Sequence, residues 1–220
     1  MTTTTTRRRA PARTGWLVPA GLVGLSLVPV VAGALRLVEL GGGERLIGEE
    51  GYSPAPGPLA THIVAVTVYA ILGAFQFAPR FRARRRAWHR VAGRLVLVCG
   101  FLGALSGLWL ALFDHRPGIS PLLTVFRLVF GTAWAVFLVL GLAAIRRRDI
   151  GRHRAWLIRG YAVGLGAGTQ AFTYTAWQLA AGEPGPVGEA LALLAGWVLN
   201  LLVAEWRLHR SRTSRLPEAR

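Results

Sequence analysis

The residues best suited to chemistry are histidines and arginines, and they stand in two similar basic segments. In the first segment the pair His89-Arg90 is followed by Arg94, and in the second the pair His153-Arg154 is followed by Arg159. Each pair comes after a run of three arginines, and each segment has a long apolar run before it and another after it. We interpret this unit, two apolar helices joined by a basic turn with a histidine, as a repeat that occurs twice.

Such a repeat could hold a haem. Neutral imidazoles are the usual axial ligands of a non-covalently bound haem iron, so His89 and His153 are candidate iron ligands, and Arg94 and Arg159 could meet the propionates. The two Nε2 atoms would then lie roughly 4 Å apart, since each would be about 2 Å from the iron. The alternative is that these histidines only hydrogen-bond a carbonyl, or pair with Glu205 or a lipid phosphate, while the arginine runs set membrane orientation.

Composition indicates a membrane protein. Of the 220 residues, 53% are hydrophobic and 16% are charged, whereas a soluble domain carries about 25% charged residues. The net charge is +16, and all 26 basic residues are arginines. Because these arginines lie between apolar runs long enough to span a bilayer, membrane orientation explains them better than nucleic-acid binding does.

Several classes of site are excluded. Cys99 is the only cysteine, which excludes a disulfide, a thiolate-based metal site and the attachment of c-type haem. The chain also has no P-loop, GxSxG, HExxH or GxGxxG motif, so we expect no soluble-type catalytic site and leave open whether it is an enzyme.

Six apolar runs predict the fold, because each is close to the ~20 residues that cross a ~30 Å hydrocarbon core. We predict an all-α integral membrane bundle of six transmembrane helices over 16–208, with the central four as two repeated hairpins. A disordered basic N-tail, 1–15, precedes it and a basic C-tail, 209–220, follows. The predicted spans are 16–38, 59–78, 91–113, 122–145, 155–181 and 187–208.

The arginine distribution predicts the orientation. The N-tail, 80–94, 146–154 and the tail from 207 hold 21 of the 26 arginines, while the alternate loops hold most of the acidic residues. The positive-inside rule therefore places both termini in the cytoplasm of a bacterial cell, with the protein in the plasma membrane. Anionic lipid headgroups on the cytoplasmic side are the expected partners of the arginine clusters.

Small residues predict helix packing. Gly160, Gly164 and Gly168 recur every four residues in the fifth span, and Gly103 and Gly107 form a similar pair in the third. Such stripes let helices approach closely. Packing of these two spans would bring the two histidines of the repeat together.

Polar residues inside the spans are further candidates for a ligand site. Arg159, Gln170, Tyr174 and Gln178 share one face of the fifth span, which indicates either interhelical hydrogen bonds or a polar cavity open to the outside. No carboxylate lies in the middle of any span, and this counts against a proton-coupled transporter.

Three polar residues lie in the second and fourth spans. His62 stands at the outer mouth of the second span and Gln76 at its inner end. Arg127 lies about two turns deep in the fourth span, and we expect it to pair with Asp114, Glu39 or an outer-loop glutamate.

Three stretches resemble a known family. THIVAVTVYAILGAFQF, RARRRAWHRVAGR and RRRDIGRHRAWLIRGYA are similar to domain-of-unknown-function family 2306, a group of predicted bacterial membrane proteins. The resemblance covers spans two to five. Leu157 stands where methionine is usual, and Gln170 where an arginine is expected. The family has no established activity, so the resemblance implies an architecture and marks residues. The matching positions are His62, Gly73, Gln76, Phe77, His89, Arg90, Gly93, Arg94, His153, Arg154, Trp156, Arg159, Tyr161 and Ala162.

Three functions fit these observations. The chain could bind a small ligand, b-type haem or a quinone, between spans two to five. It could instead carry a small molecule or lipid headgroup, which a polar cavity past mid-membrane would favour, or be an accessory subunit for a membrane-protein partner with no site of its own. The candidate ligand-binding residues are His62, Gln76, His89, Arg90, Arg94, His153, Arg154, Arg159, Gln170 and Tyr174.

Overall fold

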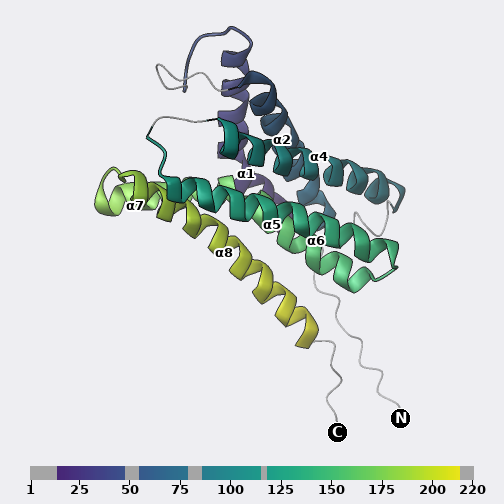
Figure 1. Ribbon diagram of the computed structural model, residues 1–220. Helices are drawn as coiled ribbons and strands as arrows, with labels where there is room; N and C mark the ends of the chain where they lie inside the picture. The colour runs from purple at the N-terminus through teal and green to yellow at the C-terminus, as the bar shows by residue number, and fades with distance from the viewer. Residues whose placement is uncertain (1–13, 48–54, 79–85, 115–117, 214–220) are drawn as a thin grey trace, which may run out of the picture.

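The computed structural model describes residues 14–47, 55–78, 86–114 and 118–213, and all regular elements among them are α-helices (Figure 1). The helices pack in one bundle, as the sequence predicts. They are α1 (Thr14–Leu40), α2 (Pro56–Gln76), α4 (Arg86–Phe113), α5 (Pro121–Arg146), α6 (Ile150–Gly164), α7 (Gly166–Ala181) and α8 (Pro186–Thr213). The arginine run at 84–86 and both chain ends lie largely outside the described residues.

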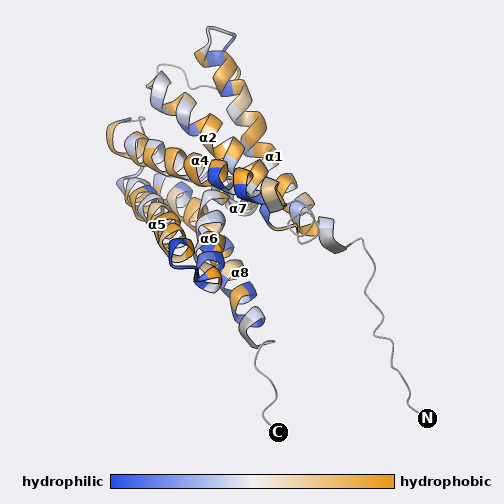
Figure 2. Ribbon diagram, turned by 90° about the vertical axis from the view of Figure 1, so that its right-hand side faces the viewer, coloured by the Kyte–Doolittle hydropathy of each residue, from blue (hydrophilic) through white to orange (hydrophobic). Residues whose placement is uncertain are grey.

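Five of these helices, α1, α2, α4, α5 and α8, are long and apolar enough to cross a membrane. Figure 2 shows that hydrophobic residues dominate them, and many large apolar side chains are exposed on their outer faces. Helices α6 and α7 have 15 and 16 residues, each short of the ~20 that a crossing takes. The helical membrane bundle is confirmed, and the count of six spans stays a prediction.

The prediction of one continuous helix over 155–181 is wrong, because the helix breaks at Leu165. Leu165 has φ −82° and ψ 3°. Its carbonyl accepts a hydrogen bond from the Gly168 N–H, three residues later, at 3.1 Å. Gly164 and Gly166 flank the break, and each glycine lowers helix stability by about 1 kcal/mol relative to alanine. A kink at closely spaced glycines follows from this low propensity.

Asn200 of α8 bridges the break. In a continuous helix the Ala162 carbonyl would accept from the Gly166 N–H. Here the Asn200 Nδ2 donates to that carbonyl at 3.0 Å, while the Asn200 Oδ1 accepts from the Thr169 hydroxyl at 2.7 Å. One amide therefore joins the end of α6 to the start of α7.

The two most extensive helix pairings are α2 with α4 and α5 with α6, which are the two hairpins that the repeat predicts. His89 lies in the first turn of α4 and His153 in the first turn of α6. The histidines thus occupy equivalent places in the two hairpins, inside the helices rather than in the turns before them.

An aromatic cluster of Tyr69, Trp134 and Tyr161 fills the centre of the bundle. The Tyr161 hydroxyl donates to the Ala70 carbonyl at 2.7 Å, and the Trp134 indole donates to the Tyr69 hydroxyl at 3.3 Å. The rings of Tyr69 and Trp134 have centroids 5.1 Å apart. All three side chains are buried, so their polar atoms need these partners.

The third span, now α4, was the predicted packing partner of the glycine stripe Gly160, Gly164 and Gly168. This prediction is wrong, and the aromatic cluster explains why. A Cβ on Gly164 would lie 2.6 Å from Tyr69 of α2 and 2.8 Å from Trp134 of α5. Gly160 faces α5 and Gly168 faces α1. The stripe does face helices, but α4 makes few contacts with α6, because large rings from α2 and α5 occupy the space.

Candidate functional site

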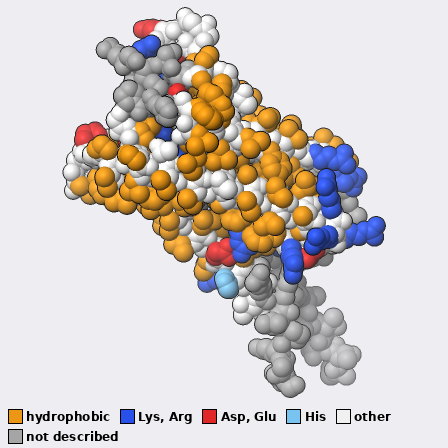
Figure 3. All heavy atoms as spheres, in the orientation of Figure 1, with side chains coloured by type: hydrophobic (Ala, Val, Ile, Leu, Met, Phe, Trp, Pro, Cys, Tyr) orange, Lys and Arg blue, Asp and Glu red, His pale blue; other side chains and the backbone are white. Residues whose placement is uncertain are grey.

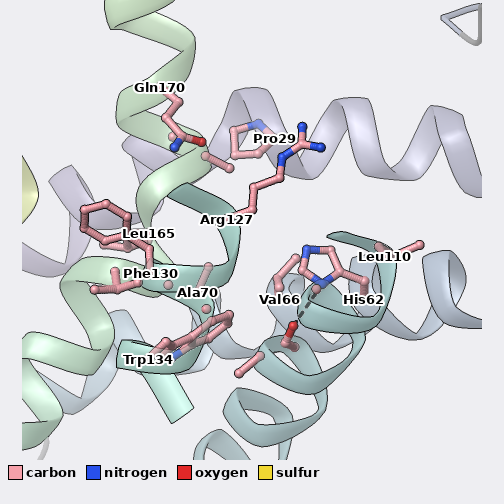
Figure 4. Close-up of a pocket in the computed structure, with 18 of the residues that line it drawn as sticks. Pro29, His62, Val66, Ala70, Leu110, Arg127, Phe130, Trp134, Leu165 and Gln170 are labelled. Carbon is pink, nitrogen blue, oxygen red and sulfur yellow. Dashed lines mark hydrogen bonds between the residues drawn. The ribbon is translucent and has the colours of Figure 1, made fainter. Parts of the chain in front are cut away.

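A cavity of about 520 Å³ lies among α1, α2, α4, α5, α7, α8 and the end of α6 (Figure 4). One end of the bundle carries Glu39, Asp114 and Glu183, and we call it the acidic end. The mouth of the cavity lies there and is lined by Asp114. It extends to Ala70 and Trp134, near the middle of their helices. The volume is within the range of ~300–1,000 Å³ typical of small-molecule sites.

His62 forms part of the polar wall of the cavity. Its Nδ1 lies 3.0 Å from the Gly103 carbonyl oxygen and 3.2 Å from the Ser106 hydroxyl. A Cβ on Gly107 would come within 3.0 Å of the His62 ring. Gly107 therefore lets the imidazole lie close to the α4 backbone, whereas the missing side chain of Gly103 leaves room for Trp134 and Val66.

Arg127 of α5 and Arg36 of α1 also line the cavity. Figure 4 shows the Arg127 side chain passing between His62 and Pro29. Arg36 forms an ion pair with Glu39 three residues later on α1. The expected pairing of Arg127 with Asp114 stays a prediction, although both side chains line the same cavity.

The opposite wall is mainly aromatic. The rings of Phe130 and Trp197 stack with centroids 4.7 Å apart, and Trp134 lies beside them along the cavity. Gln170 adds an amide here, and its Nε2 donates to the Leu193 carbonyl at 3.0 Å. The cavity thus combines a polar wall with an apolar one.

Two of the predicted ligand residues, His62 and Gln170, therefore meet at this cavity. Arg127, Trp134 and Trp197 were missing from the predicted set. A charge inside a membrane span is itself a signal of a functional site, and this signal could have placed Arg127 in the set. The aromatic wall gives no such signal, because apolar rings in a membrane helix usually face lipid or the core.

The remaining candidates lie at the other end of the bundle. Figure 3 shows arginine side chains gathered where α4 begins and where α5 turns into α6, with hydrophobic side chains covering the middle. We call this the basic end. The candidates are Gln76, His89, Arg90, Arg94, His153, Arg154 and Arg159, while Tyr174 is half-buried on α7 outside the cavity wall.

At the basic end Arg159 is paired with Glu205. The Arg159 Nε and Glu205 Oε1 atoms are 2.5 Å apart, and a second bond from Nη2 to Oε2 measures 2.8 Å. The guanidinium also lies 4.9 Å from the centre of the Trp156 ring. This bidentate pair fastens α6 to α8.

His153 donates from Nδ1 to the Gly141 carbonyl of α5 at 2.8 Å. Gln76 is the last residue of α2, beside the turn of the other hairpin, where a Cβ on Gly93 would be 3.9 Å from its Oε1. Its Nε2 is buried and has no hydrogen-bond partner within the part of the chain that the structure describes. Within that part, no group of three or more histidine, cysteine or acidic side chains could hold a metal ion.

A family model described as "Predicted membrane protein (DUF2306)" matches residues 59–208. The match begins in α2 and ends in α8, so it contains both hairpins and all of the cavity wall except the part from α1 and the loop after it. It confirms the resemblance noted from the histidine-bearing segments. The comparisons with curated proteins and with solved structures gave no match.

Proposed function

Because the chain belongs to the DUF2306 family of predicted membrane proteins, we propose that it is a membrane receptor or carrier that binds a small amphiphilic molecule in the central cavity. The observation that carries this proposal is the arrangement of the two walls. His62 and Arg127 line one side, and Phe130, Trp134 and Trp197 line the other. Small-molecule sites are typically apolar pockets with a few convergent polar groups.

The two walls indicate the shape of the ligand. The aromatic wall would hold a ring or alkyl body, and Arg127 would donate to an oxygen atom on the head group. A quinone has this form. The cavity begins at the acidic end and reaches the middle of the bundle, which supports the carrier hypothesis over that of an accessory subunit without a site.

Filling the cavity tests the proposal. Ala167 lines the cavity and is exposed, whereas Ala176 is exposed on the same helix away from it. Small molecules that co-purify with the wild type, Ala167→Phe and Ala176→Phe would be extracted and measured by mass spectrometry. We expect one molecule to be retained by the wild type and Ala176→Phe and lost from Ala167→Phe. Equal retention by all three proteins, or no retained molecule in any, would favour an accessory role.

The arginine-rich end supports the proposal that this end faces the cytoplasm of a bacterial plasma membrane, with both termini on that side. There the exposed Arg90, Arg147 and Arg154 would contact anionic lipid headgroups. The cavity mouth would then open to the outside.

A second candidate is a b-type haem between His89 and His153. One observation favours it: Nδ1 of His153 is held by the Gly141 carbonyl, which leaves Nε2 as the nitrogen that could bind iron. Two observations count against it. Helices α4 and α6 make few contacts, and Arg159, assigned to a propionate, is paired with Glu205. The absorbance spectrum of protein from haem-replete cells tests whether haem is bound, since bound haem gives a Soret band.

A further inference from the structure

We propose that the cavity selects a ligand with a phenol-type hydroxyl group, which donates to His62 and accepts from Arg127. This inference rests on the proposed function and adds the chemical class of the head group. It follows from which atoms around His62 can donate and which can only accept.

The first step fixes the proton on Nδ1 of His62. A carbonyl oxygen can only accept, so the 3.0 Å contact with Gly103 requires an N–H on Nδ1. The Ser106 hydroxyl lies 2.6 Å from the Leu102 carbonyl, and its proton is used in that bond. Ser106 therefore accepts from His62 as well, and both contacts place the proton on the same nitrogen.

The second step concerns the other ring nitrogen. In a neutral imidazole with a proton on Nδ1, Nε2 carries a lone pair and accepts a hydrogen bond. Among the described residues no hydrogen bond to Nε2 of His62 is found. Figure 4 shows the bonded nitrogen turned toward α4 and the other nitrogen turned toward the side on which Arg127 lies. The cavity therefore presents one acceptor at His62.

The third step adds Arg127. A guanidinium offers five N–H donors and no acceptor, so it can hold a protein partner and still donate to a ligand. A hydroxyl oxygen both donates and accepts, so a single hydroxyl can satisfy His62 and Arg127 together. Phe130, Trp134 and Trp197 supply ring surfaces beside it, and aromatic ligands stack favourably on such rings. A phenol or quinol has the required combination.

The test uses two probes of similar shape, 4-hexylphenol and its methyl ether 4-hexylanisole, which lacks the donor and carries one more methyl group. Their binding to the detergent-solubilised full chain would be measured by the shift of the thermal unfolding midpoint with probe concentration. We expect the phenol to bind about fivefold more tightly, on the order of one net hydrogen bond. Equal binding of the two probes by the wild type, or no binding of the phenol, would overturn the proposal.

A matched variant locates the acceptor. In His62→Asn the side-chain amide nitrogen takes the place of Nδ1 and can still donate to Gly103, but no atom replaces Nε2. We expect the preference for the phenol to disappear, so that the ratio of the two affinities falls to about one. A preference that survives in this variant contradicts the assignment. The contrast between the probes in the wild type remains decisive if the variant does not fold.

Two controls separate this inference from the proposed function. A third probe, 4-hexylbenzoate, carries an anion that can accept but not donate. Tighter binding of the benzoate than of the phenol would show that the wall selects anions and would refute the hydroxyl assignment. If Ala167→Phe bound all the probes as the wild type does, the cavity would not be their site, and the proposed function itself would fail.

Discussion

Gly168→Ala is the most informative test of how the broken helix is packed. An added Cβ at Gly168 would overlap the Leu25 carbonyl oxygen of α1 and would lie 3.0 Å from Leu25 Cγ. That carbonyl is available because Pro29, four residues later within α1, has no N–H to donate to it. The close approach of α1 therefore depends on Pro29 in one helix and on the missing side chain of Gly168 in the other.

The expected cost follows from two opposing effects. Alanine improves intrinsic helix stability by about 1 kcal/mol over glycine. An atom forced into a packed backbone contact costs roughly 1–3 kcal/mol, and a carbonyl oxygen cannot rotate away as a side chain can. We expect Gly168→Ala to lower the free energy of unfolding by up to about 2 kcal/mol.

Gly160→Ala is the matched control, from the same stripe. A Cβ at Gly160 would lie 3.5–3.7 Å from Leu138, Phe137 and Trp134, which is ordinary van der Waals distance. This variant should be neutral or more stable by up to about 1 kcal/mol. The free energy of unfolding of both variants would be measured by SDS unfolding in mixed micelles, followed by the fluorescence of the eight tryptophans. Equal effects of the two substitutions would refute the packing argument.

Three further predictions follow from the same contacts. Asn200→Leu should cost about 1–3 kcal/mol in the same assay, because it leaves the Ala162 carbonyl buried without its donor; a neutral result would mean that the break does not need the bridge. Glu205→Gln should cost only about 1 kcal/mol, since the Glu205 side chain is 40% exposed and exposed pairs contribute little; a loss above about 3 kcal/mol, the range of buried pairs, would contradict this. A cysteine at Gly185 should react with an impermeant thiol reagent in intact cells and one at Ala87 should not; the reverse labelling would overturn the orientation.

The helices could be predicted because their signals are local. Apolar runs of about 20 residues and the alternation of acidic and basic loops are read directly from the chain. The capping residues agree with them: Ser120 accepts from the Leu122 N–H, and Asp149 accepts from the Arg152 N–H at the start of α6. The hairpins could also be predicted, because the repeat joins neighbours in sequence.

The cavity and the break could not be predicted in the same way, because they depend on which helices meet. Glycines at 160, 164 and 168 indicate close packing, but their spacing does not say against what. The partners are rings from α2 and α5 and a carbonyl of α1. Span length also favoured an unbroken fifth helix, since Asn200, the donor that satisfies the Ala162 carbonyl at the break, is distant in sequence.

The histidines show how a repeat in sequence can differ from a repeat in role. The sequence pairs His89 with His153, since both open a helix after an arginine run. The structure instead gives His153 a role like that of His62, because each donates from Nδ1 to a glycine carbonyl on its hairpin partner, Gly141 or Gly103. Each bond also fixes the ring so that only Nε2 remains for a ligand. At His62 that nitrogen belongs to a cavity wall, and this difference in surroundings, rather than the histidine motif, makes the acidic end the stronger candidate site.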